Sequence, residues 1–178
     1  MLTAAKSCLV DYGFDKATLR KIADRAGVSD SLLIHQFGSR EQLLVEAMDA
    51  PEGLDRAMNL IRKFPKGMWG RVLADALQRG EVRNPTARQN LELILRASAQ
   101  SEACADMITE WVTTQLTDEI RKPGVSQPEV RARAFATVMF GVTYTHDVLK
   151  LPDFERAEQR AQTKIRSRIL QAILAEEL

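Results

Sequence analysis

The order of apolar and polar residues along the chain predicts a protein built of helices. Apolar side chains return every three to four residues in segment after segment, which is the spacing that gathers them on one face of an α-helix. We therefore expect an all-α fold. Its helices are expected at residues 2–10, 18–26, 29–37, 40–50, 54–64, 68–77, 86–98, 102–121 and 128–149, with a closing helix from 153 to the C-terminus.

Residues 18–48 contain three short helical patterns separated by two glycines. The hydroxyls of Thr18, Ser29 and Ser39 can cap the three helices by accepting hydrogen bonds from exposed backbone N–H groups. Gly27 and Gly38 permit the left-handed backbone conformation that ends a helix. Two helices joined by a tight turn of this kind form a helix-turn-helix, whose second helix can enter the major groove of DNA.

The same part of the chain carries a dense set of residues at a familiar spacing: Gly13-Phe14, Thr18, Ile22-Ala23, Ala26-Gly27-Val28-Ser29, Leu33, His35, Phe37-Gly38-Ser39-Arg40 and Leu43-Leu44. This pattern, spread over residues 2–48, resembles the N-terminal DNA-binding domain of the TetR family. The resemblance implies a dimeric transcriptional regulator, usually a repressor that a small ligand releases from DNA. It also implies a helix-turn-helix domain over residues 1–50 and a helical ligand-binding and dimerisation domain over 51–178, with the boundary at Pro51-Glu52-Gly53.

By this resemblance, double-stranded DNA is the partner of the first domain. Thr18 and Arg40 begin helices, where backbone N–H groups favour a phosphate, although Thr18 can equally serve as a cap alone. The helix dipole disfavours a cation at the position of Arg40, so a phosphate contact would explain it. His35 is either a backbone contact or an ordinary surface histidine. The residues expected to contact DNA are Thr18, Ser29, Asp30, Ser31, Leu32, Ile34, His35 and Arg40.

Two of these residues depart from what the family usually carries. Asp30 stands where lysine is common, and Ile34 stands where a tyrosine hydroxyl usually reaches a phosphate. Ile34 can instead contact a thymine methyl group, and Asp30 can accept a hydrogen bond from a cytosine amine. The departures indicate either an unusual operator preference or weakened DNA binding.

The charge of the first domain is low for a DNA-binding protein. Residues 1–50 contain six lysine and arginine residues against seven aspartate and glutamate residues, a net charge of −1, and the whole chain carries only +1. Phosphate contacts normally supply most of the non-specific affinity for DNA. We therefore expect weak non-specific binding.

The second domain should hold an effector between its helices, as helical bundles commonly do. Large aromatic and methionine side chains are either the lining of such a pocket or plain core. His146 and Asp147 can orient a polar group of the effector, or His146 is simply exposed. The candidates for the lining, which predict a mostly apolar ligand, are Trp69, Met107, Trp111, Met139, Phe140 and Tyr144.

The last two helices are long and amphipathic, and a tight turn joins them, so we expect them to pack as a hairpin capped at Asp153. In the TetR family such a hairpin pairs with its copy to form a four-helix dimer interface. A symmetric dimer suits a pseudo-palindromic operator. The candidates for the interface, each of which can equally belong to the core of one protomer, are Phe135, Met139, Val142, Ile165, Ile169 and Ile173.

Composition excludes several other classes of protein. The chain has two histidines and two cysteines, and it contains no Gly-rich phosphate loop, HExxH or CxxC motif. We therefore expect no enzyme, no cofactor and no metal site. Cys8 and Cys104 are expected to be reduced core residues. No apolar run reaches the length of a membrane span, and no secretory signal is visible, so a cytoplasmic protein is expected.

Two functions remain. The first is a ligand-responsive, operator-binding repressor of the TetR kind. The second is a helical dimer of the same fold that acts through protein partners or ligand binding, without operator recognition. Asp30, Ile34 and the low charge of residues 1–50 are the features that keep the second open.

Overall fold

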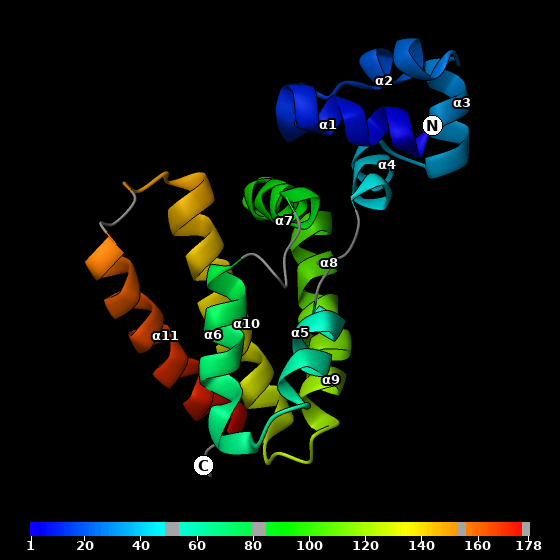
Figure 1. The fold of residues 1–178 in the computed structure, drawn as a ribbon. Helices are drawn as coiled ribbons and strands as arrows, with labels where there is room; N and C mark the ends of the chain where they lie inside the picture. The colour runs from blue at the N-terminus through cyan, green and yellow to red at the C-terminus, as the bar shows by residue number, and fades with distance from the viewer. Residues whose placement is uncertain (49–53, 80–84, 153–155, 176–178) are drawn as a thin grey trace. The chain divides into compact units, whose positions relative to one another are not determined.

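The computed structural model describes residues 1–48, 54–79, 85–152 and 156–175, and every regular element in these ranges is helical (Figure 1). The all-α expectation is therefore confirmed, whereas the expected boundary at Pro51-Glu52-Gly53 and the cap at Asp153 lie outside the described residues. Among the described helices, none is long and apolar enough to cross a membrane. The helices are α1 Leu2–Lys16, α2 Leu19–Ala26, α3 Asp30–Phe37, α4 Arg40–Ala47, α5 Leu54–Ile61, α6 Trp69–Gln78, α7 Pro85–Ser98, α8 Glu102–Trp111, α9 Thr117–Arg121, α10 Pro128–Thr143 and α11 Arg156–Ala175.

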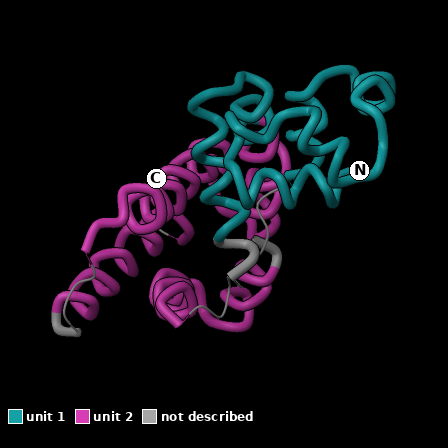
Figure 2. The backbone as a smooth tube through the Cα atoms, turned by 90° about the horizontal axis from the view of Figure 1, so that it is seen from above, with its two compact units in different colours: residues 1–50, 89–109 teal, residues 51–88, 110–178 magenta. Residues whose placement is uncertain are grey.

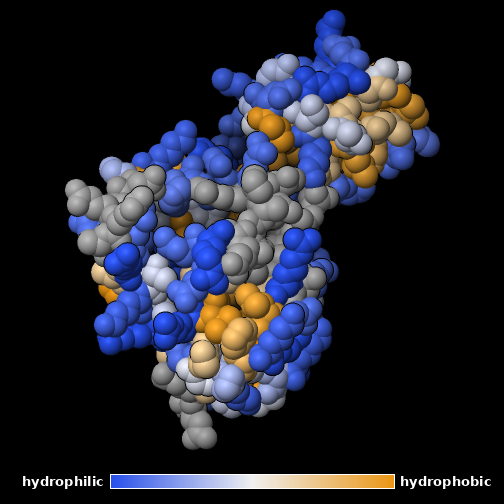
Figure 3. Space-filling view, viewed as in Figure 1, coloured by the Kyte–Doolittle hydropathy of each residue, from blue (hydrophilic) through white to orange (hydrophobic). Residues whose placement is uncertain are grey.

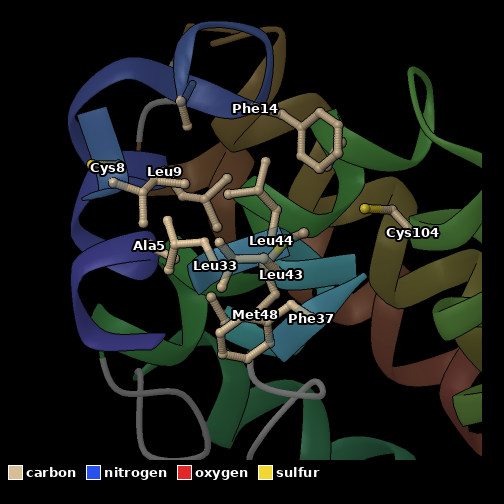
Figure 4. Packing of buried hydrophobic residues seen from close by; sticks show 14 of the residues in the cluster. Ala5, Cys8, Leu9, Phe14, Leu33, Phe37, Leu43, Leu44, Met48 and Cys104 are labelled. Atoms are coloured by element: carbon tan, nitrogen blue, oxygen red, sulfur yellow. The ribbon is translucent and has the colours of Figure 1, made fainter. Parts of the chain in front are cut away.

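The chain divides into two compact units (Figure 2). Unit 1 contains residues 1–50 and 89–109, and unit 2 contains residues 51–88 and 110–178. The first unit therefore takes in a second stretch of chain, which the expected division at residue 50 does not include. The added stretch contributes side chains to the apolar core of unit 1, shown in part in Figure 4 and composed of residues such as Ala5, Cys8, Leu9, Leu33, Phe37, Leu43, Leu44, Ile94, Ala97 and Cys104.

Local signals in residues 18–48 act as the sequence predicts. Thr18, Ser29 and Ser39 each accept a hydrogen bond from the backbone N–H three residues later, at 3.4, 3.3 and 3.1 Å. Gly27 and Gly38 end α2 and α3 with φ angles of 68° and 77°. These angles strain any side chain with a Cβ, so glycine at both positions fixes where the helices stop.

The first helix differs from its prediction. Instead of ending before Gly13, α1 continues to Lys16, with Gly13 as a non-helical break inside it at φ 75°. Leu2 and Val10 are apolar but exposed. Val10 is turned by about 100° from the buried Leu9, and Leu2 stands in the first turn of the helix, at its outer end.

Arg40, the first residue of α4, connects that helix to the segment between α1 and α2. Its Nε donates to the Ala17 carbonyl at 3.0 Å, and its Nη2 donates to the Phe14 carbonyl. The guanidinium also lies over the Phe14 ring, 5.1 Å from the centroid, and Nη1 pairs with Glu41 at 2.9 Å. The planar fork of arginine therefore joins two backbone carbonyls that follow the kink in α1.

In unit 2, α6 packs along α11 with almost no space between their backbones at Gly70. A Cβ at this position would lie 2.2 Å from the Ser167 carbonyl oxygen and 2.3 Å from the Gln171 nitrogen. The Gln171 side chain accepts from the Gly70 N–H at 2.8 Å and donates to the Lys66 carbonyl at 3.0 Å. One glutamine thus satisfies backbone groups at the start of α6.

The expected helices at 102–121 and 128–149 each contain a wider turn. Residues Val112–Leu116 and Tyr144–Val148 form π-helical turns between or after the α-helical parts. The Thr117 hydroxyl donates to the Val112 carbonyl at 2.8 Å, five residues earlier. A π-turn shifts the direction of every later side chain, so a simple count of helical turns cannot follow the buried face through it.

Arg131 links α10 to the end of α11. Its side chain is buried, and its Nη1 donates to the carbonyls of Ala172 and Ile173 at 3.2 and 2.6 Å. Its Nε donates to the Ser126 carbonyl at 2.6 Å. A cation that bonds carbonyls in the last turns of a helix is favourably placed in the helix dipole.

We expect Arg40→Lys to lower the free energy of unfolding by about 2 kcal/mol, because lysine keeps the charge but cannot bridge both carbonyls. Urea unfolding followed by circular dichroism measures this loss. Arg20→Lys, at an exposed position on α2, is the matched control and should leave the midpoint unchanged. Equal stability of the two variants would contradict the bridging role.

We expect Gly70→Ala to destabilise the protein by about 2 kcal/mol or more, since the added methyl group meets backbone atoms that cannot turn away. Gly141→Ala is the control, because a Cβ there meets no atom of the described residues within 4 Å. The control should raise stability by about 0.5–1 kcal/mol, as alanine does inside a helix.

Candidate nucleic-acid interface

The orientation of α3 is set by two side chains that point into unit 1. Leu33 and Phe37, four residues apart, are buried in the core. Successive residues of an α-helix are turned by about 100°, so Ser31 lies on the side opposite these two. The side chains of α3 that remain exposed are Asp30, Ser31, Leu32, Ile34, His35 and Gln36.

Seven of the eight residues predicted to contact DNA are exposed, and all but Thr18 belong to α3 or to its N-cap. Thr18 stands at the start of α2, the first helix of the helix-turn-helix. Ser29 and Ser31 lie together, with their hydroxyl oxygens 3.0 Å apart. Their contacts with DNA stay a prediction, but the fold presents them on one short helical segment.

Arg40, the eighth, is half-buried, with its guanidinium hydrogen-bonded to the Phe14 and Ala17 carbonyls and to Glu41. These internal contacts explain a cation at the start of a helix without a phosphate. A contact between Arg40 and DNA remains a prediction, and it is no longer needed to account for the residue.

Tyr12, on α1, makes contacts within unit 1 that the sequence pattern did not indicate. Its exposed ring lies beneath two cations, 4.1 Å from Lys21 Nζ and 5.7 Å from Arg25 Cζ. Lys21 also donates to the Lys16 carbonyl at 2.9 Å. Arg25 pairs with Asp11 at 2.6 Å, and this hydrogen bond raises the pKa of the guanidinium.

Lys21, Arg25 and Arg40 therefore contact groups within unit 1. Lys16 and Arg20 are exposed. The positive charge available to phosphates is thus smaller than the sequence count suggests. Non-specific affinity, which depends on such charges, should be correspondingly low.

Two of the predicted effector-binding residues meet in unit 2. The rings of Trp111 and Phe140 lie 6.3 Å apart and are tilted by 36°, which is a favourable aromatic contact. Trp69 is buried, and its indole N–H donates to the Phe64 carbonyl at 2.9 Å, so it anchors the turn before α6. Met139 is half-buried on α10.

The other two candidates are Met107 and Tyr144. Met107 packs against the core of unit 1, and Tyr144 is exposed in the π-turn after α10. Beside it, the Asp147 carboxylate is buried and lies 2.8 Å from His146 Nδ1, while His146 itself is exposed. That these six residues line one pocket stays a prediction.

The predicted dimer residues divide between the surface and the interior. Ile165 and Ile169 on α11 are 59% and 43% exposed, whereas Phe135 on α10 is buried within the protomer. The remaining three, Met139, Val142 and Ile173, are half-buried. Leu149 and Leu151 are further exposed apolar residues that the prediction did not include.

Across the described residues, no group of three or more histidine, cysteine, aspartate or glutamate side chains could hold a metal ion.

Known proteins resemble this chain in sequence and in fold. The chain is 25% identical over 151 residues to the HTH-type transcriptional repressor AcnR of Corynebacterium jeikeium strain K411, covering 78% of this chain and 73% of that protein. Its fold is similar to that of a TetR-family regulator from Streptomyces coelicolor A3, with a TM-score of 0.53 and 24% identity, covering 98% and 92% of the two chains. A transcriptional regulator from Rhodococcus sp. Rha1 is also similar, with a TM-score of 0.56 and 15% identity, covering 97% and 91%.

Two family matches cover most of the chain. Residues 1–47 match the family described as bacterial regulatory proteins, tetR family. Residues 69–174 match the family described as Tetracyclin repressor-like, C-terminal domain. The helix-turn-helix, the second helical unit and these matches lead to one assignment: the chain belongs to the TetR family of transcriptional regulators.

Proposed function

We propose that this regulator is a repressor that binds a pseudo-palindromic operator as a dimer and leaves DNA when a small, mostly apolar effector binds. The observation that carries the proposal is the placement of α3, which is anchored by Leu33 and Phe37 and turns Ser31 and its neighbours outward. A helix held in this way can enter the major groove. The relative from Corynebacterium jeikeium is named as a repressor, which supports the sign of regulation.

Dimerisation is supported by the outer face of α11. Ile165 and Ile169 are four residues apart, so they lie on one side of the helix, and both remain largely exposed in the protomer. A second copy would remove this apolar surface from water. We propose that α10 and α11 form the interface, with the buried Phe135 supporting α10 from inside rather than making the contact.

An apolar effector is supported by the aromatic contact between Trp111 and Phe140 in unit 2. Both side chains lie near π-helical turns, which occur frequently at functional sites of helical proteins. We propose that the protein acts as a binding protein without catalysis, in the cytoplasm, where bacterial DNA lies.

The test is a binding titration of the purified protein against DNA from its own promoter region and against random DNA, at several salt concentrations. We expect saturable binding of one dimer per site. The logarithm of the binding constant should fall with the logarithm of the salt concentration with a slope shallower than about −5, since few cations are free to contact phosphates. Equal affinity for promoter and random DNA would favour the alternative, a TetR-fold dimer that acts through protein partners.

The double variant Asp30→Lys, Ile34→Tyr should strengthen binding to random DNA by about tenfold and steepen the salt slope by about 2 per dimer, since each protomer gains a cation and a hydroxyl near phosphates. Glu110→Lys, at an exposed position in unit 2, makes the same change of charge and is the control. An equal gain in both variants, or no gain in the first, would show that α3 does not face DNA.

A further inference from the structure

We infer that α3 reads the operator through the methyl groups of thymine, using Leu32 and Ile34, and that the bases facing the first turns of the helix include thymines rather than guanines. The inference rests on the proposed operator binding and adds to it the kind of base that is recognised. It follows from three features of α3: the direction of its side chains, their chemistry and the charge around them.

The first feature is direction. Leu33 and Phe37 fix the buried side of α3, and the 100° turn between successive residues places Leu32 and Ile34 on the two flanks of Ser31. Leu32 is 44% exposed and Ile34 is 40% exposed. Two large aliphatic side chains therefore border the outermost line of a helix of only eight residues. Apolar surface is visible over the part of unit 1 where α3 lies (Figure 3).

The second feature is the set of side chains that α3 lacks. Residues 30–35 read Asp-Ser-Leu-Leu-Ile-His, so they contain no arginine, lysine, asparagine or glutamine. Arginine and lysine read guanine, and asparagine and glutamine read adenine, through paired hydrogen bonds in the major groove. Gln36 is exposed, but it stands in the last turn, whereas the N-terminal residues of a recognition helix contact the base edges.

The polar groups that do occur in the first turn of α3 can make few hydrogen bonds with bases. The Ser31 hydroxyl is shared with that of Ser29 at 3.0 Å, and Ser29 Oγ also accepts from the Leu32 N–H. Asp30 can only accept a hydrogen bond when ionised. The one apolar group that a base presents in the major groove is the 5-methyl of thymine. Leu32 and Ile34 are therefore the exposed apolar side chains of α3 that are suited to contact this methyl group.

The third feature is charge. Lys21, Arg25 and Arg40 contact groups within unit 1, so phosphate contacts from these three cations contribute little. Where phosphate attraction is small, the contacts with base edges carry a larger share of the affinity. Apolar contact with thymine is then a main source of specific binding rather than a minor addition to it.

The experiment replaces thymine by deoxyuridine, which pairs identically and lacks only the methyl group. After footprinting has located the operator, each thymine of the protected half-site is replaced in turn and Kd is measured at one salt concentration. We expect at least one position in each half-site at which Kd rises about fourfold, the ratio that corresponds to one buried methyl group. Symmetric replacement in both half-sites should give about sixteenfold.

Protein variants connect the effect to the two side chains. Leu32→Ala and Ile34→Ala should each bind the operator more weakly and lose the difference between thymine and deoxyuridine at the position that they contact. Gln36→Ala is the matched control on the same helix and should keep that difference. Both apolar residues are exposed, so the variants should unfold at the same temperature as the parent protein.

The outcomes separate the inference from the function on which it rests. Operator binding that is saturable but indifferent to every deoxyuridine would overturn the inference and leave the repressor in place. The same holds if both alanine variants keep the thymine preference. If the promoter DNA binds no better than random DNA, the proposed function and the inference are both wrong, and the apolar flanks of α3 belong to a protein contact instead.

Discussion

The burial of Leu33 and Phe37 in the core of unit 1 is the constraint on which the proposed DNA-binding surface depends. These two side chains pack among residues of α1 and α4 and so fix the rotation of α3 about its own axis. Because a helix of eight residues has little stability by itself, tertiary packing rather than helix propensity holds it in place. The residues that face outward are thus a consequence of the core, and the glycines at each end only decide where the helix stops.

Charge in unit 1 serves structure as much as recognition. Arg40 holds two carbonyls at the end of α1, while Arg25 and Lys21 surround the ring of Tyr12. A cation engaged in this way keeps its charge but has fewer donors left for a phosphate. The hydrogen bonds of Arg40 join α4 to the segment before α2, so a displacement of α4 would also shift the start of the helix-turn-helix.

In unit 2, α11 has one side packed closely against its neighbours and another side exposed to solvent. One side of α11 meets Gly70 of α6 at backbone distance, and Arg131 bonds its last carbonyls. With these contacts the position of α11 is determined within the protomer. Its other side, with Ile165 and Ile169, is exposed, which suits the proposed interface with a second copy of the chain.

The sequence by itself determined the helical class, the caps at Thr18, Ser29 and Ser39, the helix ends at Gly27 and Gly38, and the family. All of these are local signals: a period of 3.6 residues, a hydroxyl three residues before an N–H, or a glycine with positive φ. Each of these signals involves only a few neighbouring residues, so it can be recognised without knowing how distant parts of the chain pack.

Only the tertiary structure decided which distant groups meet. That Arg40 bonds carbonyls 23 and 26 residues earlier and that Met107 joins the core of unit 1 depends on how the chain returns on itself. The π-turns after Trp111 and Thr143 are likewise invisible to a count based on 3.6 residues per turn, because they change the phase of the helix. Contacts between residues far apart in sequence are set by packing of the whole unit, and a linear pattern does not contain that information.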